Sequence, residues 1–114
     1  VEQVTGICAD FGGGAFAHAS AQEDRSRLWK ARHEAYWAAR GLEPGKESYS
    51  TDACVPISEL TRCILETKAE AEASGLQCPI VGHVGDGNFH VLILHDAAER
   101  AKADALAESV ARRG

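Results

Sequence analysis

The first residues of the chain alternate between apolar and polar positions at helical spacing. The apolar positions recur every three or four residues up to a run of three glycines: Val1, Val4, Cys8 and Phe11. This spacing predicts a short helix that ends at the glycines 12–14. The next apolar residues, in segment 15–19 with Phe16 and His18 on one side, predict a short strand.

A long helix is predicted over residues 21–40. Ser20 and Glu23 have the spacing of a capping box at its start, and Gly41 is placed to end it. One stripe of this helix is apolar apart from an arginine: Leu28, Ala31, Arg32, Ala35 and Ala39. Arg32 is therefore expected on or beside the buried side. It either extends to the rim and pairs with a nearby acid, which the spacing alone favours, or grips a carboxylate with two donors.

The middle of the chain predicts a strand and a third helix. Residues 48–55 read as a strand that enters the interior at Ala53 and ends at Pro56, with Asp52 as a structural hydrogen-bonding residue. The helix that follows has Ser58 as its cap and Gly75 at its carboxyl end. Its inward-facing positions are predicted to be Leu60, Ile64 and Leu65.

The last third of the chain predicts two strands and a helix. The strands cover residues 79–84 and 89–95, and Asp96 with Glu99 forms a second capping box. The final helix carries one apolar stripe: Ala103, Leu106, Ala107 and Val110. Together the elements predict a single α+β domain over residues 1–114, a ferredoxin-like sandwich with helices packed on a mostly antiparallel sheet. We expect it to be truncated and to lack the first strand of that pattern.

The segment 82–90, GHVGDGNFH, holds the clearest candidate chemistry. Asp86 and Gly87 are typical of a two-residue type I′ turn, which would place His83 directly opposite His90. Directly opposed residues have Cβ atoms about 5 Å apart on one face of the sheet. Two imidazoles so placed can bind one divalent metal.

The residues around these histidines leave two interpretations open. Both faces of the hairpin are apolar in sequence, which predicts that it is central and covered. Protonated histidines would repel each other there, and unpaired ones would carry a desolvation cost, so a metal is the favoured interpretation. The alternative is a pair of hydrogen-bonded core histidines. No further residue of the chain is an obvious third metal ligand.

Charge and cysteine content exclude several classes of partner. The formal charge is 12 − 17 = −5 with no basic cluster, which argues against nucleic acid and anionic membranes. No apolar run has the length of a membrane helix, and the first residues lack the basic and apolar stretches expected of a signal peptide. The four cysteines lack Cys-x-x-Cys spacing and are expected as reduced, buried thiols rather than disulfides, typical of the cytoplasm or, alternatively, the mitochondrial matrix. Because the chain starts at Val1 and contains no methionine, we expect it to be part of a longer protein.

Three motifs in order resemble one enzyme family. They are RSRLWKARHEAYWAA at 25–39, YSTDACVPISEL at 49–60 and GHVGDGNFH at 82–90. This set is similar to the C-terminal domain of the FAD-linked D-lactate dehydrogenases. Glycolate oxidase and D-2-hydroxyglutarate dehydrogenase are close relatives, and all belong to the vanillyl-alcohol-oxidase flavoprotein superfamily.

The resemblance implies a site shared between two domains. An N-terminal domain would bind FAD, and a ferredoxin-like C-terminal domain would cover the flavin and hold a small 2-hydroxy acid. His83 and His90 would bind zinc or manganese, which holds the substrate and helps its deprotonation as hydride passes to the flavin. Arg32 would pair with the substrate carboxylate, and Asn88 would contact flavin or substrate.

The chain also departs from the family pattern. A Glu-His-Gly motif that supplies the third metal ligand and a candidate base does not occur before Gly114, so the catalytic base is unassigned. Ser50 stands where D-2-hydroxyglutarate relatives carry a lysine, which favours a small acid such as D-lactate. We expect the fragment alone neither to bind FAD tightly nor to turn over. The electron acceptor and oligomeric state stay open.

Two other functions compete with this one. The chain could be a free-standing ferredoxin-like module that binds a metal or a small anion. It could also be a purely structural α+β domain whose histidines are satisfied by hydrogen bonds. Substitution of both His83 and His90 separates the metal site from the structural alternative.

Overall fold

The computed structural model describes residues 1–114, which form two compact units, Val1–Ala35 and Tyr36–Gly114. The organisation of 1–114 as one domain stays a prediction. No helix of the structure is both long enough and apolar enough to cross a membrane.

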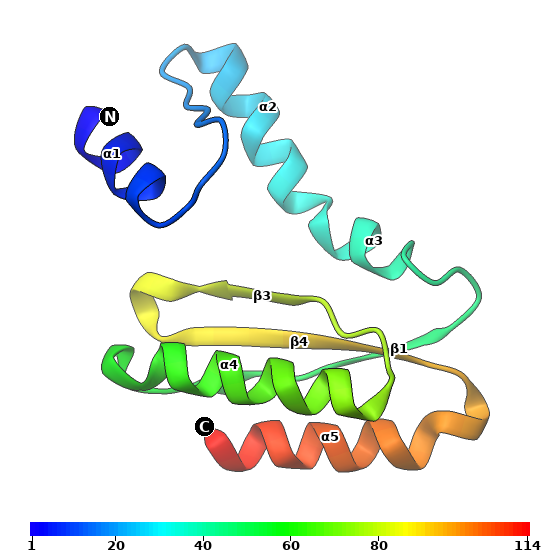
Figure 1. The fold of residues 1–114 in the computed structure, drawn as a ribbon. Helices are drawn as coiled ribbons and strands as arrows, with labels where there is room; N and C mark the ends of the chain where they lie inside the picture. Colours follow the sequence, from blue (N-terminus) through cyan, green and yellow to red (C-terminus); the bar gives the residue numbers. More distant parts are fainter. The chain divides into compact units, whose positions relative to one another are not determined.

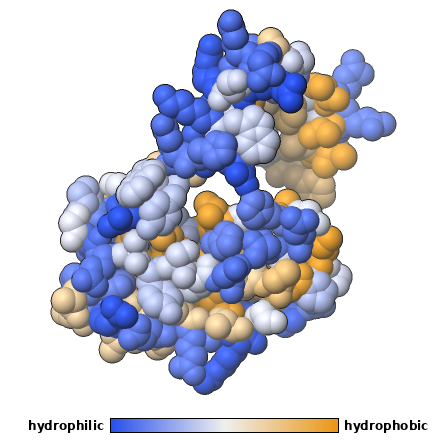
Figure 2. All heavy atoms as spheres, turned by 180° about the vertical axis from the view of Figure 1, so that it is seen from behind, coloured by the Kyte–Doolittle hydropathy of each residue, from blue (hydrophilic) through white to orange (hydrophobic).

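The amino-terminal unit contains α1 (Glu2–Asp10) and α2 (Gln22–His33). The predicted first helix is confirmed: it ends before Gly12, whose φ of +80° is a conformation that glycine adopts readily. The predicted strand at 15–19 is wrong, because no segment pairs with it to form a ladder. Neither helix has a buried residue, and Figure 2 shows hydrophobic surface over α1.

The predicted long helix over 21–40 is also wrong in part. It is divided at Glu34 into α2 and α3 (Ala35–Arg40), although the residues around the break are good helix formers and nothing in the local sequence explains it. The capping box is absent: Ala21 occupies the N-cap position, one residue after Ser20, and no side chain caps the helix.

The second unit is a four-stranded antiparallel sheet with two long helices on one face (Figure 1). The strands are β1 (Glu47–Ser50), β2 (Ala53–Cys54), β3 (Ile80–His83) and β4 (Asn88–His95), and the helices are α4 (Ile57–Ser74) and α5 (Arg100–Arg113). Short 3₁₀ turns cover Val84–Asp86 and Ala97–Glu99. The α+β class is therefore confirmed.

Strand β4 is the centre of the sheet. Along one edge, β4 pairs with β1 through residues 92–95 and with β2 through residues 88–89. Along its other edge, β4 pairs with β3. If β1 and β2 are counted as one interrupted strand, that strand is the first, β3 the second and β4 the third. The third strand then lies between the first and the second, as in a ferredoxin-like β-α-β-β-α unit. The strand of that pattern that the chain does not contain is therefore the last one, and the expectation that the first is missing is wrong.

The core lies between the sheet and the two long helices. Its largest fully buried side chains include Phe89, Val91 and Ile93 of β4 and Val110 of α5. The stripe predicted for α5 is confirmed, because all four of its apolar residues are buried. The Asp96–Glu99 capping box is also confirmed, with both reciprocal hydrogen bonds formed.

Helix α4 differs from its prediction at two points. It begins at Ile57 with Pro56 as N-cap, so Ser58 lies inside the first turn and does not cap it. Leu60 is buried and Ile64 packs against the core, but Leu65 is exposed. Five residues after Leu60, a helix has turned Leu65 about 140° away from the buried stripe. The left-handed Gly75 ends the helix as predicted.

Candidate metal and substrate site

The β3–β4 hairpin has a different register from the predicted one. The pairs are His83 with Asn88, Gly82 with Phe89 and Val81 with His90, so His83 is not directly opposite His90. The turn contains four residues, Val84–Gly87, because a 3₁₀ turn precedes the left-handed Gly87. The prediction of a two-residue Asp86-Gly87 turn is therefore wrong.

Gly87 packs closely against the residue that follows β2, Val55, and is hydrogen-bonded to it. Its φ is +71°, and a Cβ built there would lie 2.0 Å from the carbonyl oxygen of Val55. Val55 N donates a 2.9 Å hydrogen bond to Gly87 O, and Cys54 Sγ lies 3.7 Å from Asp86 O. A glycine is thus required at 87 both for its backbone conformation and for this close approach.

The two histidines nevertheless share a face of the sheet. The register differs from the predicted one by two residues, and a shift of two keeps every side chain on its original face. His83 and His90 are diagonal neighbours whose ring centroids lie 6.2 Å apart, with planes at 90°. This face is opposite to the one that packs on α4 and α5.

The hairpin is not covered on both faces as predicted. Strand β4 is central, but β3 is at the edge of the sheet, and Val81 on the histidine face is 49% exposed. His83 is exposed and His90 half-buried. The apolar residues of β3 therefore do not enclose the imidazoles, and a ligand has access to them within this unit.

The ring of His90 is oriented by the segment between β1 and β2. Its Nδ1 lies 3.2 Å from the carbonyl oxygen of Thr51 and 3.5 Å from Oδ1 of Asp52. Both partners are acceptors, so the proton belongs on Nδ1 and the lone pair on Nε2. Nε2 is then the atom that can bind a metal.

Asn88 also forms hydrogen bonds with the segment between β1 and β2 and with the start of β2. Its side-chain nitrogen donates 2.6 Å to Asp52 Oδ1 and 3.2 Å to the carbonyl oxygen of Ala53. Both amide hydrogens thus have partners within the chain, and the amide oxygen is what Asn88 offers to another molecule. Sequence reasoning identified Asp52 as a hydrogen-bonding residue but missed its contact with His90, because that contact depends on how segment 48–55 pairs with β4, which neither segment shows by itself.

The donor set fits part of a metal site. Zinc accepts histidine nitrogens at about 2.0–2.1 Å and needs three or more protein ligands in a catalytic site. No group of three or more His, Cys, Asp or Glu side chains in the structure could hold an ion. His83 and His90 could therefore provide at most two of the ligands that such a site needs.

Arg32 lies in the amino-terminal unit, on α2. It is exposed, so the prediction that it lies on or beside a buried side is wrong: α2 has no buried face within its unit. Its guanidinium carbon is 5.3 Å from the ring centroid of Trp29, at cation–π distance. It also lines a shallow pocket of about 330 Å³ with Ala19, Arg25, Leu28 and Trp29.

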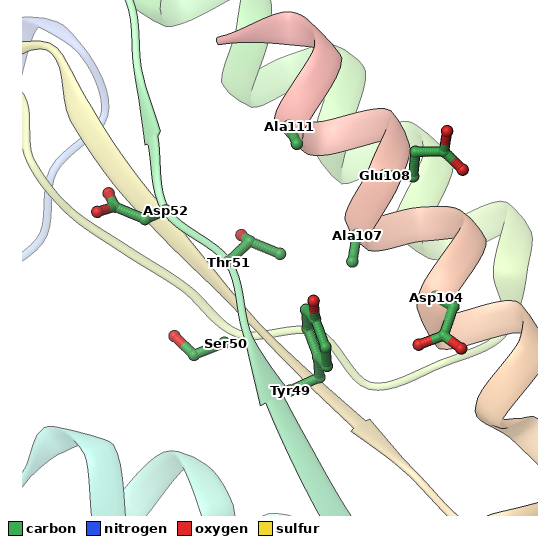
Figure 3. Close-up of a pocket in the computed structure, with 8 residues that line it drawn as sticks. All are labelled: Tyr49, Ser50, Thr51, Asp52, Asp104, Ala107, Glu108 and Ala111. Atoms are coloured by element: carbon green, nitrogen blue, oxygen red, sulfur yellow. The ribbon is translucent and has the colours of Figure 1, made fainter.

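A second hollow, of about 420 Å³, lies between the β1–β2 segment and α5 (Figure 3). Thr51 points toward α5, and Asp52 points away from it, toward the other face of the sheet. The rim on the α5 side carries the carboxylates of Asp104 and Glu108. Asp104 pairs with Arg100 and Glu108 with Arg112, so these acids are surface ion pairs.

All four cysteines are free thiols, as predicted, but the expectation that they are buried is wrong for Cys54, which is exposed. Cys63 is buried in the core, and burial raises the pKa of Cys78 to about 11. The Cys78 thiol is thus held protonated at neutral pH, where it acts as a small apolar side chain.

Comparison with known proteins identifies the family. Residues 1–113 match the family model described as FAD linked oxidases, C-terminal domain. A "Probable D-lactate dehydrogenase, mitochondrial" of Danio rerio is 52% identical over 110 residues, which are 94% of this chain and 22% of that protein. The "D-lactate dehydrogenase [cytochrome], mitochondrial" of Arabidopsis thaliana is 41% identical over 103 residues, 88% of this chain and 18% of that protein.

A more distant relative comes from a bacterium. The glycolate oxidase subunit GlcD of Escherichia coli K12 is 31% identical over 98 residues, 86% of this chain and 19% of that protein. The chain thus spans about a fifth of the length of the curated relatives it matches. The match over almost every residue shows that this chain belongs to the FAD-linked oxidase family, as its C-terminal domain.

Proposed function

We propose that the chain is the substrate- and metal-binding part of an FAD-dependent oxidoreductase. The whole enzyme would oxidise a small D-2-hydroxy acid to the 2-oxo acid by hydride transfer to the flavin. D-lactate is the substrate we propose first. Family membership and the names of the zebrafish and Arabidopsis relatives support this. The observation that carries the proposal is the pair of accessible imidazoles of His83 and His90 on one face of the hairpin.

His83 and His90 would hold a divalent metal, zinc or manganese. When bound, such an ion acts as a Lewis acid toward the hydroxyl and carboxylate of the substrate. Two rings with centroids 6.2 Å apart leave room for one ion between them. The hydrogen bond from His90 Nδ1 to Thr51 supports binding through Nε2, since metal-bound histidines generally donate their other N–H to a carbonyl or carboxylate.

Arg32 would bind the substrate carboxylate. Its planar guanidinium presents two parallel N–H donors, which match the two oxygens of a carboxylate. The Trp29 ring beside it, 5.3 Å from the guanidinium carbon, limits the orientations of the guanidinium. Asn88 would offer its amide oxygen to flavin or substrate, since its amide hydrogens are directed to Asp52 and Ala53.

Ser50 supports a small substrate. It lies at the end of β1 opposite Leu92, on the same face of the sheet as His90. A serine hydroxyl there cannot neutralise a second substrate carboxylate as a lysine could. We therefore expect a monocarboxylic hydroxy acid to be favoured over D-2-hydroxyglutarate.

The cofactor and partners follow from the same proposal. FAD would be bound mainly by another domain of the parent protein. The Arabidopsis relative is named as a cytochrome-linked enzyme, which makes a cytochrome the first electron acceptor to test. Both D-lactate dehydrogenase relatives are named as mitochondrial, which favours the mitochondrial matrix over the cytoplasm as the compartment.

The experiment uses the whole flavoprotein, with His83→Ala and His90→Ala combined in one variant. We expect loss of bound metal and of D-lactate turnover with an artificial acceptor, while the flavin absorption spectrum is kept. His18→Ala, an exposed histidine of the amino-terminal unit, is the matched control and should change nothing. Unchanged metal content and turnover in the double variant would overturn the metal assignment.

A further inference from the structure

We infer that Asp52 is a positioning residue for His90, and that Asn88 holds Asp52 in place for that purpose. Together with the Thr51 carbonyl oxygen, 3.2 Å from Nδ1, Asp52 would favour the tautomer and the ring orientation in which His90 Nε2 faces the metal. This inference rests on the proposed function, because it assumes that His90 is a metal ligand. It assigns a role to a carboxylate of the β1–β2 segment that the proposed function does not use.

The sheet register places Asp52 beside His90. Ser50 pairs with Leu92 in β1, and Ala53 pairs with Phe89 in β2. Both pairs belong to one antiparallel register, so position 52 falls directly opposite position 90. Side chains that oppose each other in this way lie on the same face, about 5 Å apart at Cβ.

Thr51 determines which way Asp52 points. The Thr51 backbone N–H donates to Val91 O at 3.0 Å, and its hydroxyl accepts from Val91 N at 3.1 Å. Thr51 is therefore buried on the helix side, and the next side chain must project from the opposite face. Figure 3 shows this alternation, with Thr51 toward α5 and Asp52 away from it.

Asn88 restricts the carboxylate to one position. Asp52 is 74% exposed and would otherwise sample several rotamers in water. Asn88 Nδ2 donates to Asp52 Oδ1 at 2.6 Å and is itself anchored by Ala53 O at 3.2 Å. The same oxygen, Asp52 Oδ1, lies 3.5 Å from His90 Nδ1, so one amide fixes the carboxylate next to the ring.

The geometry separates positioning from direct metal binding. Asp52 approaches the Nδ1 side of the ring, whereas the atom left for the metal is Nε2 on the far side. Asp52 and the metal are thus on opposite sides of the imidazole. Removing a hydrogen-bonding partner of a metal-binding histidine typically lowers metal affinity about 10- to 100-fold. Because the Asp52 side chain is largely exposed to solvent, we expect an effect at the lower end, about tenfold.

The test measures metal affinity of the whole flavoprotein, by competition of Zn²⁺ against a chelating indicator. We expect Asp52→Ala to weaken Zn²⁺ binding about tenfold. Asp52→Asn should retain most of the affinity, because its amide oxygen can still accept from Asn88 Nδ2 and lie beside His90 Nδ1. Glu72→Gln removes one exposed carboxylate from α4, on the opposite side of the sheet from the histidines, so it controls for net charge and should have no effect.

A second set of variants shows whether Asp52 acts through His90. In a His83→Ala background, where His90 remains, Asp52→Ala should still weaken Zn²⁺ binding. In a His90→Ala background it should have no further effect. An equal loss in both backgrounds, or an unchanged affinity of Asp52→Ala in the otherwise unaltered protein, would overturn the positioning role.

Failure of the proposed function would look different. If Zn²⁺ and Mn²⁺ bind the unaltered protein and the His83→Ala, His90→Ala variant equally, the hairpin is not the metal site, and both proposals fall. If only the histidine variants lose metal and Asp52→Ala does not, the proposed function stands and the positioning role alone is wrong. Co²⁺ spectra of Asp52→Ala and Asp52→Asn add a readout of ligand geometry, and identical spectra with identical affinities count against the role of Asp52.

Discussion

The two halves of β4 are built from the same alternating pattern but have different surroundings. In the first half, Phe89 and Val91 are fully buried, whereas Asn88 and His90 are only half-buried on the other face. In the second half, Leu92–His95, all four residues are buried, so both faces are covered. The strand thus changes from one covered face to two within eight residues.

This difference separates stability from ligand binding along a single strand. The second half leaves no side chain to meet another molecule. The first half presents His90 and Asn88 from a backbone that Phe89 and Val91 anchor in the core. A site on such a strand inherits the rigidity of the core while its polar side chains stay accessible.

The largest expected effect compares adjacent residues of the first half. Phe89→Ala removes a ring with no exposed surface and should cost about 3–5 kcal/mol of stability, from lost burial and the cavity left behind. His90→Ala, on the accessible face, should cost less than about 1 kcal/mol in metal-free protein. Hydrogen exchange of peptides from β4 in the whole flavoprotein measures both. Similar losses at the two positions would show that the faces do not differ as described.

The turn before β4 provides a second contrast. Gly87→Ala meets the Val55 carbonyl oxygen and a left-handed backbone, so we expect a loss of about 2–4 kcal/mol, somewhat above the cost of such strain alone. Gly85→Ala lies in the same turn with no atom within 4 Å of its Cβ and should be nearly neutral. Urea unfolding with the same exchange readout distinguishes them, and equal effects would contradict the close approach at residue 87.

Local signals in the sequence were sufficient for most elements of the second unit. The capping box at Asp96, the stripe of α5 and the glycine after α4 each determine a helix end or face within a few residues. Both strands of the hairpin were predicted for the same reason. The sharing of one face by His83 and His90 was also predicted, because a period of two survives an even shift of register.

Features that depend on distant neighbours were not predictable. Gly87 fits a two-residue or a four-residue turn, and its contact with Val55 of another segment accompanies the longer one. The residues 15–19 have strand-like alternation but no partner strand. The apolar residues of α1 and α2 form stripes that nothing in their own unit buries, so periodicity there did not indicate a core.

Asn88 offers a smaller and more specific contrast within the accessible half. If it holds Asp52, Asn88→Ala should weaken Zn²⁺ binding a few-fold, equivalent to about 0.5–1 kcal/mol. A contact of the Asn88 amide oxygen with the flavin would in addition shift the flavin potential, and a shifted potential with unaltered Zn²⁺ affinity would contradict the role in holding Asp52. Metal titration and a redox titration of the same samples measure the two effects.

The smallest expected effect lies in the helix layer, away from the accessible half of β4. Burial raises the pKa of Glu70, but hydrogen bonds from Arg113 and Ser109 outweigh it, and the net pKa is lowered. A carboxylate with a lowered folded pKa stabilises the protein above its unfolded pKa of about 4.5, and that contribution is lost as the pH falls through the folded value. Because its side chain is 35% exposed, we expect less than about 1 kcal/mol. Glu70→Gln should therefore lower the free energy of unfolding at pH 7 and make it less dependent on pH below pH 5, without changing Zn²⁺ affinity.

The control is Glu72→Gln, at an exposed residue of the same helix, which should change neither the stability nor its pH dependence. A change of Zn²⁺ affinity in Glu70→Gln would show that the helix layer and the accessible face are coupled.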